Sequence, residues 1–457
     1  MKYDRFMSTI LVTALLMGSL ACTAPSSSPS PQPNPPQVSK SLQSDKQRIM
    51  SPLASQADLA TLVNGNNTFA LDAYQSLKED GNLFFSPYSI SLALAMTYAG
   101  ARDATAQQMA DTLQFTMPQG KLPPIFNALD LELSQRGQGA KGKDDKGFRF
   151  NVVNAIWGQK DYQFLQSFLD TLAENYGAGL RLLDFGNAPE PSRIVINDWV
   201  SDQTENRIKD LIPNGAIDSS TKLVLTNAIY FNAAWQRAFR KEATYDETFH
   251  LLNGSESKVP MMHQTDLFKY VEGNDYQVVE LPYDGGELSM IVLLPKSGQF
   301  TSFERSLDYG TFASIVQGLD SKKAALTMPK FEFTTPSISL AKMLSDMGML
   351  LAFTEPSPIS GDCSENFANF SGMTGKCNLY ISDVIHKAFI SVEETGTEAA
   401  AATAVIMKGV GSSPNMEPEQ IVNMTIDRPF IFLIRDIETG TILFMGRVMD
   451  PSLSSSN

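Results

Sequence analysis

Histidine is the residue that could act as a base near neutral pH, and this chain of 457 residues has only His250, His263 and His386. A Ser-His-Asp hydrolase would have to use one of the three. The sequence contains no Gly-x-Ser-x-Gly elbow, no His-Glu-x-x-His helix and no glycine-rich phosphate loop. These residue types and spacings argue against an enzyme, and we predict no catalytic residues and no cofactor.

The three cysteines offer a different chemistry. Cys363 and Cys377 lie in one short segment, and outside the cytoplasm they could form a disulfide across that segment. Two buried thiols are the alternative, and both remain open at this point. Cys-His spacing typical of a zinc site is absent, so we predict no metal.

The most informative stretch is residues 391–405, because its residues allow more than one backbone conformation. Four successive alanines from Ala399 favour a helix. At a period of two residues, the same stretch has one small and uncharged face, while Glu398 begins the other face. Gly396 tolerates backbone angles that other residues resist. The stretch could therefore exist as an exposed loop or as a buried strand. The small face contains Thr397, Ala399, Ala401, Thr403 and Val405.

This stretch resembles the reactive-loop hinge of the serpins. The match is Glu-Glu-x-Gly-Thr-Glu-Ala-Ala-Ala-Ala-Thr at 393–403, preceded by the family's Ser-Asp-Val-Ile-His-Lys-Ala-Phe pattern at 382–389. The resemblance implies a suicide inhibitor of serine proteases. The protease cuts the loop, an acyl-enzyme forms, and residues 397–406 enter the main sheet as a new strand. The hinge residues carried over are Glu394, Gly396, Thr397, Glu398, Ala399, Ala400, Ala401, Ala402 and Thr403.

Further serpin-like motifs follow in the family's order. Residues 82–90 resemble the start of its second helix, 197–204 the helix across its main sheet, and 225–231 its central strand. Segments 259–262, 427–430 and 444–447 match as well. The resemblance spans nearly all of 57–450, which we predict to be a single serpin domain. We expect the α+β serpin fold, with helices mainly in the N-terminal part around a large mixed sheet, smaller sheets and an exposed loop.

Four polar residues match a cluster that lies beneath the opening of the main sheet in serpins. They are Ser86, Ser89, Asn227 and His386. Taken singly, each also fits an ordinary role, such as a helix-capping serine, a core asparagine or a buried core histidine. Trp235 matches the tryptophan where the loop first enters the sheet, although simple core packing would also account for it. The resemblance further implies that Glu394 anchors the base of the loop.

The bond that a protease would cut is predicted from the family's usual spacing. Counting from Gly396 gives Val410–Gly411, which suggests a target protease with an apolar specificity pocket, elastase-like or subtilisin-like. The connection over 411–420 is longer than usual, so the register is open. Cleavage after Met407 would imply a chymotrypsin-like target, and cleavage after Lys408 a trypsin-like one.

The N-terminus has the pattern of a signal peptide. Lys2 and Arg5 precede an apolar run over 10–20, and small residues lead into Cys22. We expect residues 1–22 to be a lipoprotein-type signal with Cys22 lipidated; ordinary secretion with a free Cys22 is the alternative. The Pro- and Ser-rich segment predicts a disordered tether over 23–56, and 451–457 is expected to be a tail.

Charge and hydropathy limit the partners further. A net charge of −14 with no basic stripe argues against nucleic-acid binding. No internal apolar run could span a bilayer, so we expect membrane contact only through a lipid anchor, and otherwise a secreted monomer. A non-inhibitory serpin acting as a surface binding module is the alternative function. Charged, bulky or proline residues in the hinge would favour it, whereas this hinge is small throughout.

Overall fold

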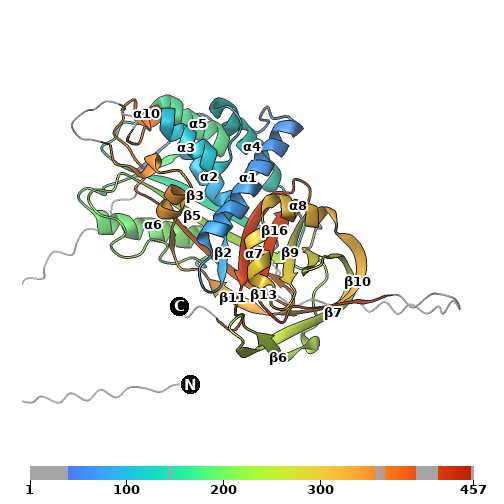
Figure 1. Cartoon of the computed structure of the whole chain (residues 1–457). Coiled ribbons are helices and arrows are strands. Elements are labelled where there is room, and N and C mark those ends of the chain that lie inside the picture. Colours follow the sequence, from blue (N-terminus) through green and yellow to red (C-terminus); the bar gives the residue numbers. More distant parts are fainter. Residues whose placement is uncertain are drawn as a thin grey trace, which may run out of the picture. The chain divides into compact units, whose positions relative to one another are not determined.

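The main sheet contains the strands between which the hinge would insert (Figure 1). The computed structural model describes residues 40–142, 144, 147–356, 363, 366–397 and 420–453. In the main sheet β5 pairs antiparallel with β3 and parallel with β13, so the sheet is mixed. Its order is β1 (Lys40–Leu42), β4 (Leu180–Leu183), β3 (Arg149–Gln159), β5 (Leu223–Ala234), β14 (Gly396–Thr397), β13 (Asp383–Glu393) and β11 (Phe331–Thr334), with β12 (Ile338–Ser339) also on β13.

The strand that follows the predicted reactive loop belongs to a second sheet. Its strand β15 pairs in parallel with β10, with Val422 opposite Ala324 at one end and Thr425 opposite Thr327 at the other. The order is β15 (Val422–Thr425), β10 (Asp320–Pro329), β7 (Glu256–Glu272), β8 (Tyr276–Pro282), β9 (Leu288–Pro295), β16 (Phe430–Asp436), β17 (Ile442–Val448) and β2 (Leu83–Phe85), with β6 (Thr244–His250) on β7.

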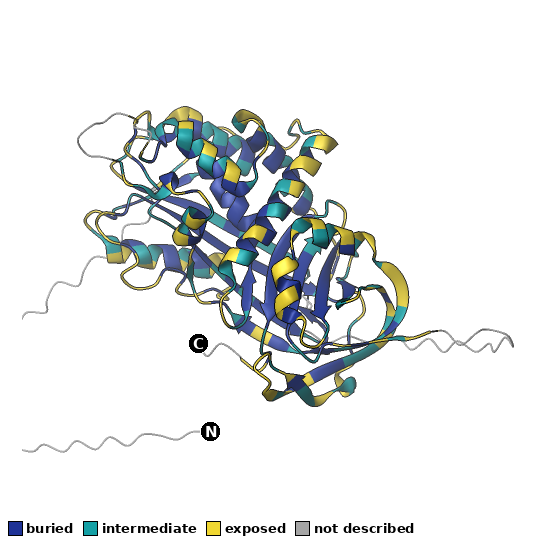
Figure 2. Ribbon diagram, viewed as in Figure 1, coloured by how far each residue is buried: buried dark blue, intermediate teal, exposed yellow. Residues whose placement is uncertain are grey.

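Helices cover the main sheet on both faces. Along β5, Leu225 and Ile229 face the core that contains α2, whereas Val224 and Ala228 face α6. Figure 2 shows α2 almost wholly buried, while α6 keeps an exposed outer surface. The α-helices are α1 (Gln56–Leu77), α2 (Pro87–Tyr98), α3 (Asp103–Leu113), α4 (Leu122–Leu133), α5 (Gln166–Tyr176), α6 (Pro189–Gln203), α7 (Phe300–Ser306), α8 (Tyr309–Gln317), α9 (Ala341–Asp346) and α10 (Ser371–Thr374). Short 3₁₀ turns are η1 (Gln119–Lys121), η2 (Lys241–Ala243) and η3 (Leu351–Phe353). None of the helices in the described part of the chain is both long and apolar enough to span a membrane.

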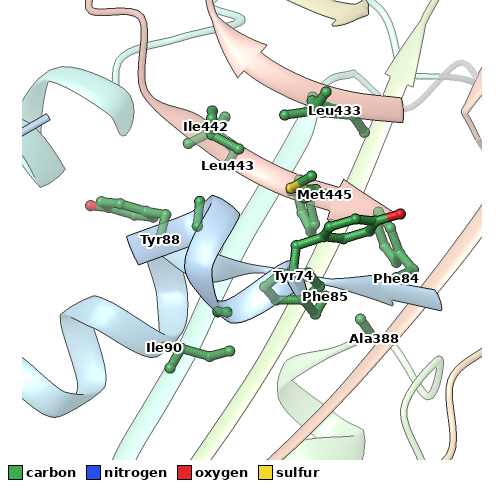
Figure 3. Close-up of a cluster of buried hydrophobic side chains, with 14 of the residues drawn as sticks. Tyr74, Phe84, Phe85, Tyr88, Ile90, Ala388, Leu433, Ile442, Leu443 and Met445 are labelled. Atoms are coloured by element: carbon green, nitrogen blue, oxygen red, sulfur yellow. The ribbon is translucent and has the colours of Figure 1, made fainter. Parts of the chain in front are cut away.

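The core beneath the main sheet is aromatic where β2 leads into α2 (Figure 3). Phe85 and Tyr88 are fully buried here beside Leu443 of β17. Between them Ser86 caps α2, because its hydroxyl accepts a hydrogen bond from the Ser89 amide and proline follows at the first helical position. Ala388 of β13 faces the same cluster. The start of α2 is thereby fixed directly under the main sheet.

The chain joins the fold earlier than we expected. We predicted a disordered tether over 23–56, but β1 pairs antiparallel with β4. Arg48 bonds Asp130 of α4 at 2.6 Å, and the Ile49 amide donates to the Glu174 carbonyl at 2.9 Å. The reason is that β4 would otherwise be an edge strand with unpaired backbone groups, which β1 satisfies. Residues 1–39, including Cys22, and residues 454–457 lie outside the described residues.

The helix across the main sheet is shorter than its apolar periodicity suggested. Apolar residues recur at helical spacing from Ile196 to Leu211, but α6 ends at Gln203. Thr204 ends it, because its hydroxyl accepts a hydrogen bond from the Ile208 amide, and Glu205 and Asn206 then take a left-handed backbone conformation. Ile208 is still fully buried, which is why the periodicity continues past the helix.

Candidate functional site

The strands β5 and β13 pair directly along one part of their length, here called the lower part of the seam. At the other end, the upper end, β14 lies between them. Residues Asp383 to Ala388 pair directly with Val224 to Ile229. Above them β14 lies between the two strands, with Thr397 opposite both Ala233 of β5 and Val392 of β13. The first residues of the predicted hinge are therefore in the sheet. Glu398, Ala399 to Ala402 and Thr403 lie outside the described residues, as do Met407, Lys408, Val410 and Gly411.

Gly396 is required by a close backbone approach. A Cβ atom at this position would lie 2.2 Å from the Ala233 carbonyl oxygen and 2.6 Å from the Ala234 Cα, and the φ angle is +153°. Any side chain would force β14 away from β5. In this chain, therefore, only glycine fits at this position of the hinge motif.

Trp235 lies where the hinge enters the sheet. Its indole Nε1 donates to the Glu393 carbonyl at 2.9 Å, and its backbone amide donates to the Thr395 carbonyl at 2.9 Å. Its ring stacks on that of Tyr283, with centroids 4.7 Å apart and an interplanar angle of 8°. The end of β5 therefore clamps the main chain on which the hinge turns.

Glu394 is anchored on both its backbone and its side chain. Its carbonyl accepts from the Phe239 amide at 2.8 Å, and its carboxylate accepts from the Lys330 ammonium group at 2.8 Å. Burial opposes ionisation of this carboxyl group, but the Lys330 bond and further hydrogen bonds outweigh burial, so the pKa of Glu394 is lowered. The carboxylate thus remains charged although its side chain is only 6% exposed.

The polar residues under the sheet form one connected row across three strands. Asn154 of β3 lies opposite Asn227 of β5, which lies opposite His386 of β13. The Asn227 amide group donates to the Ser89 hydroxyl and to the Asn154 side-chain oxygen, each at 2.6 Å. Ser86 joins through its backbone amide, which donates to His386 Nε2 at 3.3 Å. Because β14 lies in this seam, extending it downward would separate Asn227 from His386.

The hydrogen bonds of His386 assign its proton. Nε2 accepts from the Ser86 amide, so Nδ1 carries the proton and donates to the Asn227 side-chain oxygen. Burial lowers the pKa of His386 to about 3, and the bond to Asn227 opposes this only in part. An imidazolium would need to place a second proton against the Ser86 N–H. The row is therefore held by a neutral histidine.

Three members of the site were not predicted from the sequence. Asn154 interrupts an alternating strand pattern, and this polar interruption is a signal that could have been used. Lys330 lies between β10 and β11, and Tyr283 follows β8. For these two we find no sequence signal, because their roles depend on chain segments far apart in sequence that meet at the hinge.

Each of the three histidines has a polar partner among the described residues. His386 is enclosed in the polar row, His250 lies 3.3 Å from Glu256, and His263 lies 3.0 Å from the Thr327 hydroxyl and 3.4 Å from Glu247. No cluster of three or more His, Cys, Asp or Glu side chains suited to a metal occurs among the described residues. The feature that distinguishes this site is the position of β14 between β5 and β13.

Cys363 and Cys377 form a disulfide, with their Cα atoms 5.2 Å apart. Cys377 is buried and follows α10, whose residue Met373 accepts a backbone bond from Leu165 at 2.7 Å. Of the two alternatives open from the sequence, the structure has the bonded pair.

Comparisons with known proteins agree with this geometry. The family model described as Serpin (serine protease inhibitor) matches residues 64–451. A serpin-like protein of Thermococcus kodakarensis is 39% identical, covering 97% of this chain and 99% of that protein. The human leukocyte elastase inhibitor is 36% identical, covering 85% and 99%. The solved structure of human thyroxine-binding globulin superposes with a TM-score of 0.74 at 29% identity, covering 86% and 100%. These likenesses confirm the predicted α+β serpin fold, and the chain belongs to the serpin family.

Proposed function

We propose that this serpin inhibits serine proteases by a suicide mechanism and supplies no catalytic group of its own. The observation that carries the proposal is the position of β14, which lies between β5 and β13 at the upper end of a seam that is otherwise closed. A loop cut beyond Thr397 could extend this short strand downward residue by residue. Kinship with the leukocyte elastase inhibitor supports the same function.

Insertion would exchange one set of interactions for a larger one. The parallel β5–β13 pairing and the Asn227–His386 bond must break. In return, residues 397–406 would pair with strands on both sides, and each backbone hydrogen bond contributes about 1 kcal/mol net. The uncut state would therefore be metastable and held by a kinetic barrier. The protease, bound as an acyl-enzyme, would be carried with the strand and distorted before deacylation.

The target class follows from the residue before the cut bond. Cleavage at Val410–Gly411 would fit a serine protease with an apolar pocket, elastase-like or subtilisin-like. Met407 and Lys408 remain the alternatives, with chymotrypsin-like and trypsin-like targets respectively. The relative that is named an elastase inhibitor favours the first class.

We further propose an extracytoplasmic location. The signal-like segment 1–22 and the residue pattern before Cys22 support secretion with a lipid anchor on the cell envelope. A monomer suffices for the mechanism, because every element that it uses lies in one chain.

The test mixes the purified protein with elastase, subtilisin and trypsin and follows the products by denaturing gel and intact mass. We expect a covalent complex with an apolar-pocket protease and release of a peptide that begins at Gly411. Release beginning at another residue would keep the mechanism and move the bond. Cleavage within the loop without a complex for any protease would contradict inhibition. That outcome would favour the alternative, a binding module, as in the thyroxine complex of thyroxine-binding globulin.

A further inference from the structure

We propose that Tyr283 is a positioning residue that holds the hinge in the main sheet before cleavage, by hydrogen bonding to the Thr397 hydroxyl. This inference rests on the proposed inhibitory function for its kinetic consequence, but not for the contact itself. The Tyr283 hydroxyl lies 3.0 Å from Thr397 Oγ1. Tyr283 is fully buried and Thr397 is 2% exposed, so the bond forms away from water.

The tyrosine ring is fixed independently of the hinge. It stacks on Trp235 at 4.7 Å and meets Phe231 edge-on at 5.1 Å. The backbone of Tyr283 is held as well, since its amide donates to the Leu288 carbonyl at 2.9 Å. The position of the Tyr283 hydroxyl is therefore fixed by contacts other than the hinge. A residue that is already in place when its partner arrives loses little conformational freedom on binding it.

The pair is exclusive within the described residues. Neither the Tyr283 hydroxyl nor Thr397 Oγ1 has a second hydrogen-bond partner there. If the hinge left the sheet, the tyrosine hydroxyl would lose this bond while its ring stayed packed against Trp235 and Phe231. A buried donor without a partner is unfavourable, so the bond favours the entered position of Thr397. The site thereby selects a residue with a small side chain that also carries a hydroxyl group.

This contact would act on both stages of inhibition, in opposite directions. With the hinge seated, insertion after cleavage starts from an existing β14 and needs no new entry step. The same restraint shortens the free part of the loop and makes it less able to fit a protease. Loss of the bond should therefore speed acylation and slow insertion relative to deacylation.

The contact itself is tested by hydrogen–deuterium exchange of the peptide that contains residues 395–397. Tyr283→Phe keeps the ring stack and removes only the hydroxyl, and Thr397→Val keeps the shape and removes the other one. We expect each variant to raise exchange at this peptide about threefold to tenfold, the effect of one net hydrogen bond on an equilibrium. The double variant should add nothing further, and Thr397→Ser should stay close to the wild type.

A matched control is Tyr176→Phe in α5. The Tyr176 hydroxyl is buried and has no hydrogen-bond partner among the described residues, so its removal should leave hinge exchange unchanged. Unchanged exchange in Tyr283→Phe would overturn the inference. Additive effects of the two single variants would also overturn it, because they would show that the hydroxyls do not act on each other.

The kinetic consequence is measured with the protease that forms a complex. Tyr283→Phe should acylate faster and show a higher stoichiometry of inhibition, each by a few fold, while Thr397→Ser behaves as the wild type. Equal stoichiometry in Tyr283→Phe and wild type would overturn the positioning role. If the wild type forms no complex at all, the proposed function fails, and the exchange experiment still decides whether Tyr283 holds the hinge.

Discussion

The two ends of the β5–β13 seam are held by different kinds of interaction. At the upper end, fixed groups hold the hinge main chain: Trp235 binds the carbonyls of Glu393 and Thr395, and Phe239 binds that of Glu394. At the lower end, the side chains of Asn154, Asn227 and His386 join the strands to one another. If a strand entered as proposed, the contacts of Trp235 and Phe239 could persist, whereas the Asn227–His386 bond would have to break. Under the proposed function, the contacts of Trp235 and Phe239 are therefore the entrance of the seam, and the row of Asn154, Asn227 and His386 is its closure.

The largest expected effect is at the entrance. Thr397→Arg would place a charged side chain where Thr397 is 2% exposed, and an unpaired buried charge is strongly unfavourable. We expect the fold to be kept, β14 to be expelled and trapping to be lost, so that the protein becomes a substrate. Gel assays of complex against cleaved product measure this. The control is Thr265→Arg on an exposed part of β7, which should trap normally, and full trapping by Thr397→Arg would contradict the insertion mechanism.

The next effect is at the closure. Asn227→Ala would remove one side chain and leave Ser89, Asn154 and the His386 Nδ1–H each short of a partner. We expect a loss of about 2 to 4 kcal/mol in the free energy of unfolding, as for other broken buried networks. The midpoint of the first urea transition measures it. Asn253→Ala in an exposed turn should shift the midpoint very little; an equal shift would show that the row contributes nothing special.

The closure also predicts a pH dependence. The pKa of His386 is about 3 in the folded state against 6.5 for a free histidine. Between these values only the unfolded chain takes up the proton, so stability should fall as pH decreases from about 6.5, by up to about 1.4 kcal/mol per pH unit from this residue. Above pH 6.5 the residue contributes no slope. Urea midpoints for the wild type and His386→Gln should differ in slope over this window. Asn253→Ala, which changes an exposed turn and no titratable group, is the control and should keep the wild-type slope.

The smallest expected effect is on stability, at the Lys330–Glu394 ion pair beside the entrance of the seam. Lys330→Met would leave the Glu394 carboxylate, 6% exposed, without its cation. Lys330 itself is 32% exposed, so solvent screens the pair and we expect a loss of about 1 kcal/mol. Because the pKa of Glu394 is lowered in the fold, this contribution should be present above the pKa of an unfolded glutamate and disappear as pH falls. Thermal midpoints at pH 7 and at pH 4 measure it, and equal differences at both would contradict an electrostatic origin.

Much of this arrangement could be predicted from the sequence. The small residues after Gly396, the serine–proline start of α2 and the apolar β5 with Asn227 inside it are local patterns, and local patterns report backbone preference and burial. The resemblance of several motifs to the serpins, and not these patterns alone, predicted the fold class and the polar residues Ser86, Ser89, Asn227 and His386. The same resemblance placed Trp235 and Glu394 near the hinge.

Other features depended on which segments meet. Asn154 joins the row only because the β3 register puts it opposite Asn227, and Tyr283 reaches Thr397 across 114 residues of chain. The pairing of β1 with β4 could not be predicted for the same reason, because only the assembled sheet shows which strand lies at its edge and can accept another strand. The sequence by itself therefore determined where a helix begins, which strand is buried on both faces and which stretch has a small, uncharged face. The tertiary structure alone decided their partners, since hydrogen bonds between distant strands depend on register and burial that no local pattern encodes.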